Sequence, residues 1–95
     1  MPTSRSIVES AVFKVLRRER IRQGFDDEDL TVATVPLTLD KFDSQMGLVM
    51  TLKISRDLGI KLPAKVNLFV HDNGKERLSI EQAIYKMTEF VKVEE

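Results

Sequence analysis

The chain has 95 residues, of which 42% are hydrophobic and 32% charged, and its 15 basic and 15 acidic residues leave no formal net charge. This length suits one small domain with one modest core, so residues 1–95 are expected to form a single domain. The absence of cysteine excludes disulfides, thiolate metal sites and cysteine nucleophiles.

The first predicted helix begins near Ser6, because Ser6 and Glu9 have the spacing of a capping box, and Gly24 is a plausible stop. Its apolar residues fall on one stripe: Val8, Val12, Val15 and Leu16.

A basic cluster on this helix precedes an acidic block at residues 26–29. The cluster comprises Lys14, Arg17, Arg18, Arg20 and Arg22. A phosphate-binding patch is one interpretation. We favour a solvated helix face, because the acidic block would repel a nucleic-acid backbone.

Residues 25–42 form a long connection that is acidic first and apolar later. Val35, Leu37 and Leu39 alternate as in a strand, but no convincing second strand is available to pair with them. A lone strand would leave its backbone hydrogen-bonding groups unsatisfied. We therefore expect an ordered loop that tucks its apolar residues under the helices, and loops of this length are often functional.

The second long helix runs from about Ser44 to Leu58, with Asp43 as N-cap and Gly59 after its end. Met46, Met50, Ile54 and Leu58 form its core stripe. Leu48, Val49 and Leu52 lie beside or outside that stripe, and this surplus predicts an exposed contact surface. The alternative is a helix buried on two sides.

Residues 66–70 are short and apolar, and they fit either a turn or two of helix or a brief strand. Residues 71–77 form a polar loop centred on the turn dipeptide Asn73-Gly74. A hairpin is less favoured, because residues 78–80 are too few and too helix-like for a second strand. Ser79 and Gln82 form another capping-box pair. The last helix then carries its apolar residues at helical spacing: Ile80, Ala83, Ile84, Met87, Phe90 and Val91.

Ser44 has the most distinctive chemistry in the chain. A serine in the first turn of a helix points its hydroxyl at solvent, where the free backbone N–H groups and the dipole favour an attached phosphate. A serine nucleophile would need an oriented base. His71 lies in a polar loop with no obvious carboxylate partner beyond Asp72, so we predict no catalytic residues and no enzymatic activity. His71 cannot build a metal site without carboxylate help, and no metal is expected.

The sequence resembles the acyl carrier protein family, in which the helix that carries the prosthetic group opens with Asp-Ser-Leu. Here it opens with Asp43-Ser44-Gln45, and the apolar-Pro step that follows the helix in that family is Leu62-Pro63. Residues 79–84 resemble the family's last helix, where a Thr/Ser-Val-x-x-Ala-Ile pattern is usual. The resemblance covers residues 43–63 well and residues 79–91 fairly, whereas the first helix matches only as an amphipathic helix.

This resemblance implies an all-α, four-helix bundle with a long loop between helices 1 and 2 and a short third helix. Ser44 would receive 4'-phosphopantetheine from coenzyme A through a magnesium-dependent phosphopantetheinyl transferase, with Asp43 capping the helix and presenting the serine. The thiol of the arm would hold an acyl, aminoacyl or polyketide intermediate as a thioester. The core sheltering an acyl chain would be lined by Met50, Ile54, Leu58, Leu62, Ile80 and Ile84. The face shown to acyl-loading and acyl-processing enzymes would comprise Gln45, Leu48, Val49, Leu52, Lys53 and Arg56.

Three departures from the family pattern indicate a specialised carrier of fatty-acid, polyketide or secondary metabolism. Phe42 and Gln45 replace the usual neighbours of the serine, Lys53 and Arg56 replace acidic residues on the recognition helix, and residues 71–77 resemble an insertion. Because electrostatic complementarity governs partner choice, the partners should differ from fatty-acid synthase enzymes, which present basic patches.

The expected protein is a cytoplasmic monomer that binds its partners transiently. No apolar stretch approaches the length of a membrane span and no signal-peptide core is present, so no membrane contact is expected. The main alternative is a helical protein-interaction module with a carrier-like fold and no prosthetic group. A nucleic-acid binder that uses the arginine-rich first helix, and an enzyme with Ser44 as its own nucleophile, are the remaining alternatives.

Overall fold

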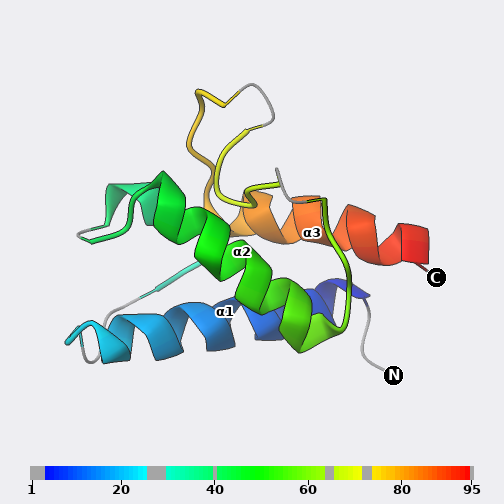
Figure 1. Ribbon diagram of the computed structural model, residues 1–95, viewed down its shortest axis with the longest axis horizontal. Coiled ribbons are helices and arrows are strands. Elements are labelled where there is room, and N and C mark those ends of the chain that lie inside the picture. The colour runs from blue at the N-terminus through cyan, green and yellow to red at the C-terminus, as the bar shows by residue number, and fades with distance from the viewer. Residues whose placement is uncertain (1–3, 26–29, 40, 64–65, 72–73, 95) are drawn as a thin grey trace.

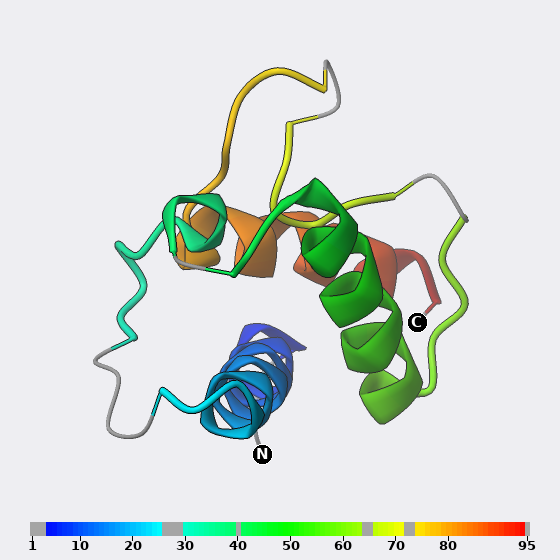
Figure 2. The same ribbon diagram turned by 60° about the vertical axis from the view of Figure 1, so that its left-hand side comes forward.

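Three α-helices and one short 3-10 helix make up the regular structure of the described chain. The structure is a computed structural model that describes residues 4–25, 30–39, 41–63, 66–71 and 74–94. The helices are α1 (Ser4–Arg22), α2 (Ser44–Leu58) and α3 (Ile80–Glu94), and the 3-10 helix η1 spans Pro36–Thr38. Helix α1 packs against both α2 and α3 (Figure 1). Figure 2 views α1 nearly along its axis, with the connecting segments outside the helices. The predicted all-α fold is confirmed.

The predicted count of four helices is not confirmed, because residues 66–70 form a turn that leads into an antiparallel bridge between Val70 and Arg77. Around that bridge, the His71 N–H donates to the Glu76 carbonyl at 2.8 Å and the Leu78 N–H donates to the Phe69 carbonyl at 2.9 Å. The segment has one isolated bridge and no strand in its described residues, so the hairpin that the sequence made less favoured is not formed as a pair of strands. Gly74, which lies between the bridged residues, has φ +74°, a left-handed conformation that glycine adopts without a steric penalty.

Helices α1 and α2 both end at the glycines predicted from the sequence, whereas the start of α1 differs from the prediction. Helix α1 begins at Ser4, two residues before the predicted start near Ser6, so the Ser6–Glu9 pair lies inside the helix and is not its cap. The end of α1 was predicted correctly. The Phe25 N–H donates to the Arg20 carbonyl and the Gly24 N–H to the Ile21 carbonyl, which is the Schellman pattern. Gly59, at φ +70°, ends α2 in the same way.

The core forms where the predicted apolar stripes of the three helices meet. The hydrophobic core residues that are at most 4% exposed come from all three helices and from the connections: Val8, Ala11, Val12, Leu16, Phe42, Met50, Ile54, Leu68, Phe69, Ile80, Ala83, Ile84 and Met87. Phe42 and Phe69 meet edge to face, with ring centroids 5.6 Å apart. Because Phe42 directly precedes the Asp43-Ser44 pair, this contact fixes the chain where it enters α2.

The long connection is an ordered loop in its described residues, as predicted, and Leu30, Pro36 and Phe42 are buried in it. Its backbone carbonyls also accept hydrogen bonds from the first N–H groups of α3. The Ile80 N–H donates to the Thr34 carbonyl at 2.8 Å and the Glu81 N–H to the Val32 carbonyl at 2.9 Å. These are amides that a helix leaves without partners of its own.

The predicted Ser79–Gln82 capping box is present at the same end of α3. The Ser79 N–H donates to Gln82 Oε1 at 2.8 Å, and the Gln82 N–H donates to Ser79 Oγ at 3.2 Å. The backbone N–H groups in the first turn of α3 are therefore hydrogen-bonded partly by this side-chain pair and partly by carbonyls of the long connection.

Thr51 joins α2 to the turn at residues 66–70. Its side chain is buried in the middle of α2, with the residue 3% exposed. Thr51 Oγ1 donates to the Gly47 carbonyl at 2.7 Å and accepts from the Leu68 N–H at 3.0 Å. The hydroxyl is therefore the partner of a buried backbone amide that belongs to another segment.

Replacing Thr51 by valine keeps the shape of the side chain but leaves the Leu68 amide unsatisfied, so Thr51→Val should lower the free energy of unfolding by about 1–3 kcal/mol. Urea denaturation measures this loss. Thr88→Val is the matched control, since Thr88 is also buried, at 6% exposed, and among the described residues its hydroxyl bonds only to the Ile84 carbonyl four residues before it. We expect a loss below about 1 kcal/mol for the control. Equal losses in the two variants would show that the Leu68 amide does not depend on Thr51.

Candidate functional site

Ser44 is the first residue of α2, and its side chain is exposed. Asp43 is the N-cap, as predicted, in an extended conformation with φ −100° and ψ −174°. Its Oδ1 accepts a hydrogen bond from the Met46 N–H at 2.9 Å. The cap holds the first turn of α2 closed, so the Ser44 hydroxyl stands at the surface beside the positive end of the helix dipole.

Asn67 fixes the backbone of Ser44 to the turn at residues 66–70. Asn67 Nδ2 donates to the Ser44 carbonyl at 3.0 Å, while Asn67 Oδ1 accepts from the Phe69 N–H at 3.0 Å. The amide fits tightly against the helix, because a Cβ added at Gly47 would lie 2.8 Å from Asn67 Oδ1. This clamp, which is the contact of Asn67 with Ser44 and Gly47, was not predicted from the sequence. The signal that could have indicated it is Gly47 itself, because a glycine in the interior of a helix often has a packing reason.

A surface pocket of about 440 Å³ opens beside Ser44, between the start of α2, the turn and α3. Lys86 of α3 lines it, and its Nζ donates to the carbonyls of Asn67 at 3.2 Å and Val70 at 3.0 Å. His71 lies on the rim of the same pocket. The fold therefore brings His71 and Lys86 to the same pocket as Ser44. His71 is an exposed loop residue, as predicted, but its position beside Ser44 was not predicted from the sequence.

The predicted partner face of α2 is at the surface, with one exception. Gln45 and Arg56 are exposed, and Leu48, Val49 and Leu52 are 41%, 45% and 51% exposed. Lys53 is the exception, since it is half-buried against α1. The exposed apolar surplus that the helical spacing predicted is thus confirmed, and α2 is not buried on two sides.

An apolar groove of about 570 Å³ runs along this face, between α2 and the segment that follows it. Leu52 and Val49 form one wall, and Ile60 and Leu62 line it from the other segment. Leu48 and Val66 line both this groove and the pocket beside Ser44, so the two depressions adjoin.

The residues expected to shelter an acyl chain divide into two groups. Met50, Ile54, Ile80 and Ile84 are completely buried in the core. Leu58 and Leu62 are half-buried, and Leu62 lines the surface groove. The apolar groove that could hold a ligand therefore lies at the surface of α2, and the core around Met50 and Ile54 is filled.

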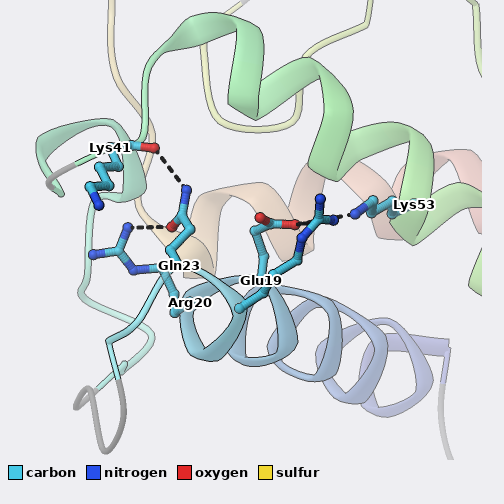
Figure 3. Close-up of polar contacts among 6 residues, drawn as sticks. Glu19, Arg20, Gln23, Lys41 and Lys53 are labelled. Atoms are coloured by element: carbon cyan, nitrogen blue, oxygen red, sulfur yellow. Dashed lines mark hydrogen bonds and ion pairs between the residues drawn. The ribbon is translucent and has the colours of Figure 1, made fainter.

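A polar chain ties the end of α1 to the segment that enters α2 (Figure 3). Arg20 Nη1 donates to Gln23 Oε1 at 3.0 Å, and Gln23 Nε2 donates to the Lys41 carbonyl at 3.1 Å. Arg20 is only 2% exposed and its guanidinium lies 4.1 Å from the centroid of the Phe25 ring. The interpretation of the basic cluster as a solvated face is therefore wrong for Arg20, because Phe25 covers it. Lys41 adopts φ +60°, a strained conformation that this hydrogen bond holds in place.

Glu19 forms a second polar link, from α1 to α2 (Figure 3). Its side chain is 9% exposed, and Oε1 accepts from Lys53 Nζ at 3.2 Å. Arg22 Nη1 lies 3.9 Å from the same oxygen. The sequence analysis did not single out Glu19 or Gln23, because both look like solvated helix residues until the partner element is in place.

No protein-family model matches the chain, and neither the curated proteins nor the solved structures contain a match to it. Within the described residues, no three His, Cys, Asp or Glu side chains gather as metal ligands. None of the helices in the described part of the chain is long and apolar enough to cross a membrane. The exposed Ser44 and the depressions around α2 are the features that suggest a function.

Alanine at position 47 tests the clamp on Ser44. Alanine normally stabilises a helix by about 1 kcal/mol relative to glycine. Here the new methyl group must displace the Asn67 amide, so Gly47→Ala should instead lower the free energy of unfolding by about 1 kcal/mol, through the loss of the two Asn67 hydrogen bonds.

The control for this experiment is the same substitution in an Asn67→Ser background, where the obstructing amide is gone. There Gly47→Ala should stabilise the protein, and urea denaturation of the four chains gives the double-mutant cycle. Stabilisation by Gly47→Ala in both backgrounds would mean that Asn67 does not press against α2.

Proposed function

We propose that the protein is a specialised acyl carrier that holds an acyl, aminoacyl or polyketide intermediate as a thioester on 4'-phosphopantetheine attached to Ser44. The observation that carries this proposal is the exposed Ser44 hydroxyl at the first position of α2, behind the Asp43 cap. In this proposal, α1, α2 and α3 correspond to the three long helices of a carrier bundle. The bridged segment around residues 66–77 takes the place of the short third helix, and the protein works in the cytoplasm.

The surroundings of Ser44 suit an attached phosphodiester. The N-terminal amides and dipole of α2 favour negative charge at this point. The ammonium group of Lys86 lines the adjoining pocket and contributes further positive potential. A phosphopantetheinyl transferase would join the Ser44 oxygen to the phosphorus of coenzyme A, with loss of the serine proton and departure of adenosine 3',5'-bisphosphate. The thiol needed for thioester chemistry then comes from the arm, since the chain has no cysteine.

The adjoining grooves offer the arm a path along α2. An arm that leaves Ser44 meets the pocket walled by Leu48 and Val66, and beyond these two residues lies the larger apolar groove. An apolar cargo in that groove would cover Val49 and Leu52, which otherwise face water. The groove is therefore a better place for the cargo than the filled core around Met50 and Ile54.

A second candidate function is a helical interaction module without a prosthetic group. The exposed Leu48, Val49 and Leu52 beside an apolar groove favour it, because a partner helix binds to such a surface by apolar contacts. The two candidates differ in one measurable respect, which is whether Ser44 carries an arm in the cell.

Incubation with coenzyme A, Mg²⁺ and a broad-specificity phosphopantetheinyl transferase should add the mass of one phosphopantetheine arm, as measured by intact-protein mass spectrometry. The Ser44→Ala variant should gain none. Ser10→Ala, which removes an exposed hydroxyl from the middle of α1, should gain the arm as the wild type does. A wild-type chain that stays unmodified with several transferases, and that is also unmodified when isolated from its own cells, would contradict the carrier and favour the interaction module.

A further inference from the structure

A basic groove lies on the side of α2 that faces α1, away from the turn at residues 66–70. It measures about 440 Å³. Its charged lining consists of four cations and two carboxylates: Arg18, Arg22, Lys53 and Arg56, with Glu19 and Asp57. We refer to it below as the α1–α2 groove.

The two carboxylates of this groove already have cationic partners. Glu19 Oε1 lies 3.2 Å from Lys53 Nζ, and Asp57 Oδ1 lies 3.1 Å from the Nζ atom of Lys14. Arg18 and Arg56 are exposed, and neither guanidinium has an ion pair or hydrogen-bonding partner within the described part of the chain. The groove therefore presents two arginines whose charge no ion pair neutralises among the described residues.

The exposed apolar residues of α2 continue directly into this groove. Val49, Leu52, Lys53 and Arg56 follow the i, i+3, i+4, i+7 spacing of one helix face. Arg56 lines both the apolar groove and the α1–α2 groove. The exposed side of α2 is thus a ridge with apolar surface on one flank and, on the other, the α1–α2 groove, where Arg56 of α2 and Arg18 of α1 have no ion pair among the described residues.

We propose that this ridge binds an acidic amphipathic helix of a partner protein. The apolar side chains of that helix would cover Leu48, Val49 and Leu52, and its carboxylates would pair with Arg18 and Arg56. Arginine suits this pairing because its guanidinium binds a carboxylate through two parallel hydrogen bonds. The inference rests on the proposed function in one respect, which is that the partner would be an enzyme that acts on the carried cargo.

Charge complementarity selects this occupant over the others. A second copy of the chain, placed with the same ridge inward, would add two more arginines but no free carboxylate from this groove, because Glu19 and Asp57 already have cationic partners. A nucleic-acid backbone would leave the apolar flank of Val49 and Leu52 without a matching surface.

The experiment is an NMR titration of the ¹⁵N-labelled full chain with a synthetic amphipathic peptide about five turns long. The peptide carries leucine along one stripe and glutamate along the adjoining flank. The largest amide shifts are expected in residues 15–22 and 48–57, and binding should weaken as salt is added. Two matched peptides, with glutamine or lysine in place of glutamate, should bind at least about tenfold more weakly.

Charge reversal on the protein provides the complementary test. The double variant Arg18→Glu/Arg56→Glu should bind the glutamate peptide at least about tenfold more weakly than the wild type and should bind the lysine peptide more tightly. Arg77→Glu is the matched control. It reverses one exposed arginine on the segment that projects away from α1 (Figure 1), and it should leave both affinities unchanged.

Equal binding of the three peptides, equal binding by wild type and double variant, or shifts centred outside α1 and α2 would overturn the inference. So would tighter binding to vesicles that contain phosphatidylserine, or to a DNA duplex, than to the glutamate peptide. Arm attachment is measured by mass on the same samples, and the double variant should still take the arm on Ser44. A chain that takes no arm but binds the glutamate peptide at the ridge overturns the proposed function alone.

Discussion

Two polar side chains, Thr51 and Asn67, hold the turn at residues 66–70 against the N-terminal half of α2. Each side chain both donates and accepts a hydrogen bond. Thr51 donates to the Gly47 carbonyl and accepts from the Leu68 N–H, and Asn67 donates to the Ser44 carbonyl and accepts from the Phe69 N–H. The bonds from the Leu68 N–H to Thr51 and from Asn67 to the Ser44 carbonyl join the turn to α2, and the other two fix Thr51 within α2 and Asn67 within the turn. The pocket beside Ser44 and the apolar groove both have Val66 as a wall, so both depend on this attachment.

Helix α2 faces three different environments: the core, the apolar groove and the α1–α2 groove. Its inner face supplies Met50 and Ile54 to the core, its flank toward the turn carries the exposed apolar residues, and its flank toward α1 carries Lys53 and Arg56. The proposed functions use the flanks and leave the inner face to stability. The exposed Leu48, Val49 and Leu52 give the proposed partner surface its apolar residues, which a helix with a single buried stripe would lack.

The parts of this structure that local chemistry determines were predictable from the sequence. The Asp43 cap, the Gly24 and Gly59 stops and the Ser79–Gln82 capping box each depend on residues within one helical turn, and each is present. The core stripes of the three helices follow from helical spacing and are also present.

Features that depend on distant partners were not predictable in the same way. Arg20 has the sequence context of a solvated arginine, yet Phe25 packs on its guanidinium, and its partner Gln23 bonds in turn to the carbonyl of the distant Lys41. The fit of Asn67 against Gly47 and the burial of Glu19 beside Lys53 also require the packing of separate segments. Residues 66–70 lacked a distinctive period, and the bonds from Thr51 and Asn67 decide their conformation.

The start of α3 has a consequence for how the fold assembles. Its first amides donate to carbonyls of Val32 and Thr34, which belong to a segment far earlier in the chain. The opening turn of α3 therefore lacks part of its hydrogen bonding until the connection between α1 and α2 has docked. Connection and helix should gain or lose protection from hydrogen exchange together, as one cooperative unit that spans both halves of the chain.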